Sequence, residues 1–269
     1  MPKTYTIKNH NFEEITEIFR YASSKAASKV LEIYQSDQLN KIIKEDNSPL
    51  TKADIESNRI IFEILNKELR SITRVSEESP IPDLSDCGEI ILIDPLDGTK
   101  EFINKNGEFT INIALVQKNI PRIGVIDVPV QEIQYYSNGI DSFKKTANST
   151  KKINVKKNKT LTITVSRSHL DEKTLRFLGS IENFKKKTVG SSIKLCLIAE
   201  GMADLYVRYG NTMEWDIAAG HAILKNSGGN IFSSNLRELK YGKKGFLNTS
   251  FIAFNYLDND IKTKFTFNL

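Results

Sequence analysis

Apolar residues recur every three or four positions along residues 11–35, the spacing that places them on one face of a helix. The residues with this spacing are Ile15, Phe19, Ala22, Ala26, Val30 and Ile33. We therefore expect an amphipathic helix there, followed by the polar stretch 41–50 and a second helix over 51–70. Thr51 and Asp54 resemble a capping box at the start of the second helix, with Asp in place of the usual Glu.

Short runs rich in β-branched residues follow and predict strands. They cover residues 90–93, 107–119, 121–129 and 132–137. Before the first of them, residues 71–89 read as a loop. The lysine-rich segment 144–160 reads either as a boundary between two halves or as a solvated edge strand and linker.

The second half of the chain alternates strand and helix patterns. They predict a strand over 161–169, a helix and then a strand within 190–210, and a helix over 214–229 that is closed by glycines. Because such elements stack in layers, this order predicts a layered α/β architecture of two subdomains, residues 1–155 and 156–269.

Composition fits a globular protein and argues against several classes. Of 269 residues, 39% are hydrophobic and 26% charged, ordinary values for a chain that buries one large core or two smaller ones. No run approaches the ~20 apolar residues of a membrane span, and the start, MPKTYTIKNHNFEEI, lacks the apolar core of a signal peptide. Cys87 and Cys196 show no pairing motif, so we expect a cytoplasmic protein, with peripheral association at the inner membrane left open. The net charge of +5 favours an anionic small molecule, and no motif indicates a nucleic-acid partner.

Acidic residues gather at three places where predicted elements begin or end. They are Glu77 with Glu78, Asp94 with Asp97, and Asp216. Taken singly, these are ordinary features: a solvated pair, an Asp-Gly turn and a helix cap. Taken together, carboxylates from separate elements can converge into an all-oxygen site, which suits Mg²⁺. Zinc is disfavoured because the three histidines are scattered without ligand spacing.

Gly98 and Thr99 directly follow the aspartates and suggest an anion site. Glycine lets the backbone approach an anion closely, and a helix that begins at TKEFINK would direct its free N–H groups there. Metal-binding carboxylates beside a bound anion are typical of phosphoryl transfer or phosphatase chemistry.

Two longer motifs carry a family resemblance. DPLDGTKEF at 94–102 and WDIAAGHAIL at 215–224, preceded by SEES at 76–79, resemble the inositol monophosphatase superfamily of Mg²⁺-dependent, lithium-sensitive phosphatases. The resemblance covers roughly residues 12–255. It implies an αβαβα sandwich in which the first subdomain carries most metal ligands and the second carries substrate contacts and the last ligand.

Finer features resemble the 3′(2′),5′-bisphosphate nucleotidase branch of this superfamily. They are the continuation KEF at 100–102 and the segments VSRSH, GSSIK and YVRYG. The resemblance implies hydrolysis of the 3′-phosphate of 3′-phosphoadenosine 5′-phosphate, giving AMP and phosphate, by in-line attack of a metal-activated water. It also implies two or three Mg²⁺ per site and a monomer or homodimer; a role in sulfur metabolism goes with this branch.

The resemblance assigns roles to particular residues. The metal ligands would be Glu77, Asp94, the carbonyl of Leu96, Asp97 and Asp216. The catalytic residues would be Asp54 and Thr99, which position and deprotonate the attacking water, together with Glu77. The substrate contacts would be Gly98, Thr99, His169, Ser191, Lys194 and Arg208. Trp215 is expected to pack beneath the site.

Simpler interpretations of these residues stay open. Asp54 and Ser191 could be helix caps, Lys194 a solvated lysine, and Arg208 half of a surface ion pair. Glu78 could replace Glu77 as a ligand.

Other functions also stay open. Within the superfamily, the alternative is an inositol or other sugar phosphatase. The alternative of a different class is a non-catalytic phosphonucleotide sensor. Ser191-x-x-Lys194 matches the S-x-x-K of penicillin-recognising enzymes only superficially, because their S-D-N and K-T-G motifs are absent.

Overall fold

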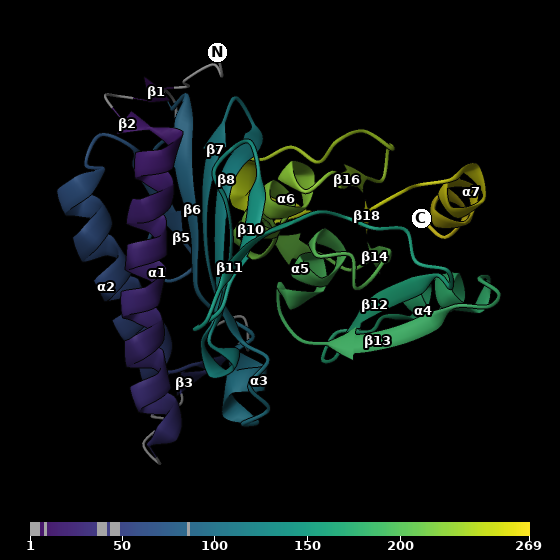
Figure 1. Cartoon of the computed structure of the whole chain (residues 1–269), viewed down its shortest axis with the longest axis horizontal. Coiled ribbons are helices and arrows are strands. Elements are labelled where there is room, and N and C mark those ends of the chain that lie inside the picture. Colours follow the sequence, from purple (N-terminus) through teal and green to yellow (C-terminus); the bar gives the residue numbers. More distant parts are fainter. Residues whose placement is uncertain (1–5, 8–9, 37–41, 44–48, 85–86) are drawn as a thin grey trace.

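The computed structural model describes residues 6–7, 10–36, 42–43, 49–84 and 87–269. It stacks five layers: a helix pair, a large sheet, a second helix pair, a smaller sheet, and an outer helix pair (Figure 1). The layered α/β architecture expected from the sequence is confirmed. No helix in the described part of the chain is long and apolar enough to cross a membrane.

The first layer consists of α1 (Phe12–Gln35) and α2 (Lys52–Glu68), which pack against each other and against the large sheet. Both helices were predicted, and both begin with a capping box. In α1, Asn11 and Glu14 each accept the other's backbone N–H at 2.9 Å. Most of the polar stretch between the helices, Lys41 and residues 44–48, lies outside the described residues.

In the described part of the chain, seven strands form the large sheet; β5 and β6 pair in parallel, and the other neighbours pair antiparallel. In spatial order they are β11 (Thr150–Ile153), β10 (Ser142–Lys145), β9 (Ile133–Ser137), β8 (Ile120–Val128), β7 (Thr110–Gln117), β6 (Glu89–Asp97) and β5 (Thr73–Ser76). The lysine-rich segment therefore starts as an edge hairpin of this sheet, and the predicted loop 71–89 contains the short strand β5. That strand is four residues long and mixed in polarity, too short for a periodic signal.

The five-stranded sheet comes from the second half of the chain. Its order is β13 (Lys185–Val189), β12 (Thr162–Ser166), β14 (Leu205–Arg208), β18 (Phe251–Phe254) and β16 (Asn230–Ser233). Between the sheets lie α5 (Ile193–Ala199) and α6 (Glu214–Asn226), and on the outer side lie α4 (Glu172–Gly179) and α7 (Asn259–Phe267). The remaining elements are α3 (Thr99–Ile103), the 3-10 turns η1 (Pro129–Gln131) and η2 (Lys244–Phe246), and the strand pairs β1 (Thr6–Ile7) with β2 (His10–Asn11), β3 (Ile42–Ile43) with β4 (Pro49–Leu50), and β15 (Thr212–Met213) with β17 (Leu247–Asn248).

Both faces of the large sheet are covered, so its central strands are apolar on both sides. Ile91 and Ile93 of β6 face the α1–α2 layer, whereas Ile90 and Leu92 pack on the α5–α6 side. The contact with α6 is very close at Gly124 of β8, where an added Cβ would lie 2.2 Å from the carbonyl oxygen of Ala219. This close packing fixes the position of α6, and with it Asp216, relative to the large sheet.

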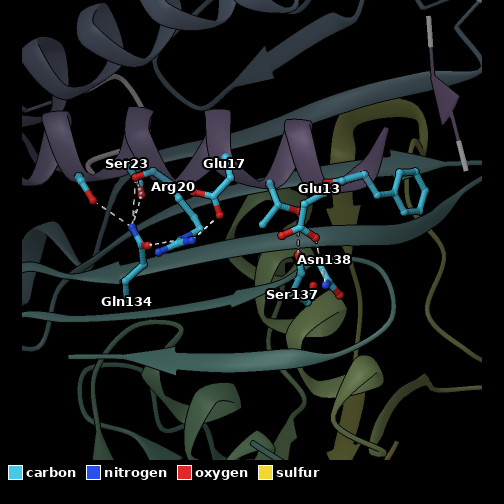
Figure 2. Close-up of polar contacts among 10 residues, drawn as sticks. Glu13, Glu17, Arg20, Ser23, Gln134, Ser137 and Asn138 are labelled. Carbon is cyan, nitrogen blue, oxygen red and sulfur yellow. Dashed lines mark hydrogen bonds and ion pairs between the residues drawn. The ribbon is translucent and has the colours of Figure 1, made fainter. Parts of the chain in front are cut away.

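A polar network also joins α1 to the sheet (Figure 2). Arg20 Nε donates to Gln134 Oε1 at 3.0 Å, and Gln134 Nε2 donates to Ser23 Oγ at 3.0 Å. The same amide donates to Asp127 Oδ2 at 3.0 Å, and burial raises the pKa of Asp127 to about 6. These hydrogen bonds connect α1 to Asp127 of β8 and Gln134 of β9.

Candidate active site

One cavity of about 640 Å³ opens where β6, β14 and the starts of α3, α5 and α6 meet. Eleven of the twelve residues assigned by the sequence line it. They are Glu77, Asp94, Leu96, Asp97, Gly98, Thr99, His169, Ser191, Lys194, Arg208 and Asp216. The twelfth, Asp54, reaches the same place through its hydrogen bond to Thr99.

The corner between β6 and α3 places several of these groups side by side. The pairing of β6 with β7 is irregular between Asp94 and Asp97, so the strand bulges there. Asp94 Oδ1 accepts the N–H of Leu96 at 3.1 Å, which tightens the bend. Gly98 then adopts φ 89°, a left-handed conformation that favours glycine. The helix that follows is only the single turn Thr99–Ile103, so little helix dipole is available there.

Asp97 is held by three neighbours that sequence reasoning missed. Its Oδ2 accepts the backbone N–H of Ser192 at 2.7 Å and lies 3.4 Å from both Thr110 Oγ1 and Asn112 Nδ2. Burial raises the pKa of Asp97 to about 6, and the charge of Lys194 limits the rise. A polar residue at Asn112, inside the apolar strand pattern TINIALV, was the available sequence signal for this support.

The acidic wall of the cavity carries unbalanced charge. The pKa of Asp94 lies well above its ordinary value. Burial is the largest cause, and the negative charge of Glu77 is the next. The pKa of Asp216 is also raised well above its ordinary value, mainly by burial and next by the charge of Asp97. Asp216 Oδ2 accepts the N–H of Met213 at 2.8 Å. Asp216 therefore acts as a cap at the third residue of α6 while it lines the cavity.

The chemistry of this wall fits a hard cation, since its donors are carboxylate and carbonyl oxygens. Among the described residues, however, no three His, Cys, Asp or Glu side chains converge closely enough to hold a metal ion as they stand. Metal ligation by these residues therefore stays a prediction.

Asp54 links the capping box of α2 to the cavity. Its Oδ2 accepts the N–H of Thr51 at 2.7 Å, and its Oδ1 accepts Thr99 Oγ1 at 3.1 Å. Thr99 Oγ1 also lies 3.3 Å from the carbonyl oxygen of Leu96. Burial raises the pKa of Asp54, with a smaller contribution from the charge of Glu77.

The opposite wall is cationic. Lys194 is 6% exposed and donates to the carbonyl oxygen of Ser191, so it is not a solvated lysine. Burial lowers its pKa to about 8, although the charge of Asp97 opposes that change. Arg208 forms no surface ion pair with any described carboxylate; it donates to the carbonyl oxygens of His169, at 2.5 Å, and of Gly210, at 3.2 Å. Partial desolvation of the His169 ring, together with the charges of Lys100 and Arg208, lowers its pKa.

Three further expectations can be compared with the structure. Glu77 lies on the cavity wall, whereas Glu78 is absent from the described lining. The residue that caps α5 is Ser192, not Ser191. The buried Oγ of Ser191 has no hydrogen-bond partner among the described residues. Trp215 packs against Phe246 with ring centroids 5.9 Å apart and also borders the cavity.

The comparisons with known proteins agree with the motifs. A model described as the inositol monophosphatase family matches residues 11–263. The 3′(2′),5′-bisphosphate nucleotidase CysQ of Salmonella typhimurium is 36% identical over 243 residues, which cover 89% of this chain and 97% of that protein. The protein of the same name from Buchnera aphidicola is 38% identical over 256 residues, covering 92% of this chain and 96% of that protein.

Solved structures show the same likeness. CysQ from Bacteroides thetaiotaomicron, described as a bacterial member of this family, superimposes with a TM-score of 0.83 at 34% identity, covering 91% of this chain and 99% of that one. An IMPase from Thermotoga maritima has the same fold, with a TM-score of 0.80 at 23% identity, covering 94% of this chain and 96% of that one. The motifs, the layer order and these matches lead to one conclusion: the chain belongs to the inositol monophosphatase family.

Proposed function

We propose that this protein is a phosphoric monoester hydrolase, a 3′(2′),5′-bisphosphate nucleotidase. It removes the 3′-phosphate of 3′-phosphoadenosine 5′-phosphate and yields AMP and phosphate. The observation that carries the proposal is the cavity itself, where an acidic wall with the Asp54–Thr99 pair faces Lys194 and Arg208.

The two walls divide the work of phosphate ester hydrolysis. The residues Glu77, Asp94, Leu96 (by its carbonyl), Asp97 and Asp216 would hold two or three Mg²⁺. Bound Mg²⁺ supplies neutralisation of phosphate charge and a water of lowered pKa. Backbone N–H groups of Gly98 and Thr99 hold the scissile phosphate.

The Asp54–Thr99 pair performs the proton chemistry. Thr99 Oγ1 donates to Asp54 Oδ1, so the hydroxyl oxygen is oriented to accept a hydrogen bond from the attacking water. The raised pKa of Asp54 makes this carboxylate a stronger base than an ordinary aspartate. Glu77 lies close enough to both Asp54 and Asp94 to raise their pKa values, which supports its place beside the same water.

Preference for a nucleotide with two phosphates rests on the cationic wall and on the relatives. Lys194 and Arg208 add two cationic side chains to the cavity lining, which suit the binding of a second phosphate. The relatives that cover nearly the whole chain at 36% and 38% identity carry the nucleotidase name.

A substrate panel tests the proposal. Phosphate release would be measured from 3′-phosphoadenosine 5′-phosphate, its 2′-phosphate isomer and inositol 1-phosphate, with and without Mg²⁺ and lithium. We expect the highest kcat/KM for the bisphosphate nucleotides, only with Mg²⁺, and inhibition by lithium. A clear preference for the inositol ester would establish the sugar-phosphatase alternative, and binding without phosphate release would establish the sensor.

A further inference from the structure

Glu101 is a buried carboxylate on the cavity wall to which the proposed chemistry gives no task. It lies in the first turn of α3 and is 4% exposed. A carboxylate is costly to bury, and it repels the phosphate that the cavity is proposed to bind. The charges of Lys194 and Arg167 are near enough to interact with it, since Glu101 raises the pKa of both, but neither side chain hydrogen-bonds to it in the described part of the chain.

The two oxygens of Glu101 have different surroundings. Oε1 accepts Ser168 Oγ at 2.5 Å. Oε2 lies 3.2 Å from the place that a Cβ on Gly98 would occupy, and no donor in the described part of the chain hydrogen-bonds to it. Ser191 lies beside the same point, with its Cβ at 3.3 Å, and its buried Oγ has no hydrogen-bond partner in the part of the chain that the structure describes. Two unused polar groups thus flank Gly98.

The charge of Glu101 restricts what can bind Oε2. An ionised carboxylate only accepts hydrogen bonds, and an ionised phosphate offers none to donate. A hydroxyl or amino group of the substrate can donate to Oε2, which accepts no hydrogen bond from the described part of the chain. Because Gly98 is proposed to contact the scissile phosphate, that donor must be attached close to the phosphate ester.

We propose that Glu101 is a specificity-determining residue, which accepts a hydrogen bond from the hydroxyl on the carbon next to the phosphorylated carbon. In a ribose 3′-phosphate this is the 2′-hydroxyl, and in a ribose 2′-phosphate it is the 3′-hydroxyl. This inference rests on the proposed function, which places the scissile phosphate at Gly98. It predicts that the protein selects ribonucleotides over deoxyribonucleotides.

The test compares 3′-phosphoadenosine 5′-phosphate with its 2′-deoxy analogue as substrates of the full chain. We expect wild type to favour the ribonucleotide in kcat/KM by about 10- to 100-fold, the range for a lost hydrogen bond to a buried charged group. Glu101→Met should bring this ratio close to one by slowing the ribonucleotide alone. Glu101→Gln, which keeps the shape and a weaker neutral acceptor, should fall between the two.

Two control variants separate this role from a structural one. Asp127→Asn removes another buried carboxylate, remote from the cavity lining, and should leave the ratio unchanged. Ser168→Ala removes the partner of Oε1 and should also leave the ratio unchanged. The inference is overturned if wild type shows no preference, if both Glu101 variants keep the wild-type ratio, or if Ser168→Ala alone abolishes it.

Failure of the proposed function gives a different result. If wild type hydrolyses inositol 1-phosphate but neither nucleotide, the proposed substrate is wrong. The same variants are then compared on inositol 1-phosphate and an analogue without the adjacent hydroxyls, where the same pattern of ratios supports or overturns the role of Glu101. If no phosphate ester is hydrolysed, both proposals fail.

Discussion

The two carboxylate oxygens of Asp54 bond to different partners. Oδ2 accepts both the N–H and the Oγ1 of Thr51, at 2.7 and 2.6 Å, and completes the capping box of α2. Oδ1 is thereby turned toward Thr99. The capping interpretation and the catalytic hypothesis are therefore compatible, since the cap holds the carboxylate in the orientation that the proposed water activation needs.

A prediction follows for the hydroxyl of Thr99. Thr99→Ala removes the group that is proposed to hold the attacking water, and we expect kcat to fall about 100-fold or more. Thr99→Ser keeps a hydroxyl at the same position and should retain most of the activity. Steady-state phosphate release measures both, with circular dichroism melts as a check on folding. Wild-type kcat in Thr99→Ala would contradict the assignment.

At the scale of elements, the hydrogen-bond network that joins α1 to the large sheet contains the buried carboxylate of Asp127. Asp127 is 7% exposed, and its hydrogen-bond donors Gln134, Ser23 and Ser24 are all neutral. Its pKa of about 6 in the folded protein is above the ordinary 3.8, so folding favours the protonated form. The stability that this gives is present below about pH 4 and is lost as the pH rises through 6.

Asp127→Asn should therefore stabilise the protein at neutral pH. The amide oxygen still accepts from the same donors, and no charge has to be buried. The free energy of unfolding should rise by up to about 3 kcal/mol near pH 7.5, and this gain should shrink to nothing near pH 4. Urea unfolding of both proteins across this range measures the difference. A gain that is equally large at low pH would show that the carboxylate charge is not its cause.

At the scale of the whole molecule, the acidic wall is assembled from three separate parts of the chain. Glu77 follows β5, Asp94 and Asp97 belong to β6, and Asp216 belongs to α6, more than a hundred residues later. Folding brings these carboxylates together against their mutual repulsion. A cation that binds among them would therefore stabilise the folded state.

Chelation and Mg²⁺ addition test this at the level of the whole protein. EDTA should abolish phosphate release, and Mg²⁺ should restore it. Mg²⁺ at about 100 times its Kd should add about 2.7 kcal/mol to the free energy of unfolding, seen as a higher Tm. Asp97→Asn should lose both turnover and the Mg²⁺-dependent rise in Tm, while its melt without Mg²⁺ stays cooperative because Asn can still accept the N–H of Ser192. A fully active Asp97→Asn protein would refute the metal site.

Local patterns were enough to predict the long elements and the turn at the centre of the site. The helices α1, α2 and α6 and the strands β6 to β9 bury whole faces, so their apolar periodicity is visible in the sequence. The corner DPLDGT is specified by adjacent residues, since its bend depends on its own proline, glycine and aspartates. The division into subdomains at 155/156 stays a prediction. The strands of the large sheet all precede this point, and those of the five-stranded sheet all follow it.

Contacts between residues far apart in the chain were decided only by tertiary structure. The sequence could not show that Ser192 would hold Asp97 or that Lys194 would be buried. Nor could it show that Glu101 would accept a hydrogen bond from Ser168, 67 residues later. The sequence by itself determined the elements, the family motifs and the types of chemical group, because these depend on neighbouring residues. Burial, pKa values and the pairing of the two cavity walls depend on how the sheets and helices pack, so they appear only in the folded molecule.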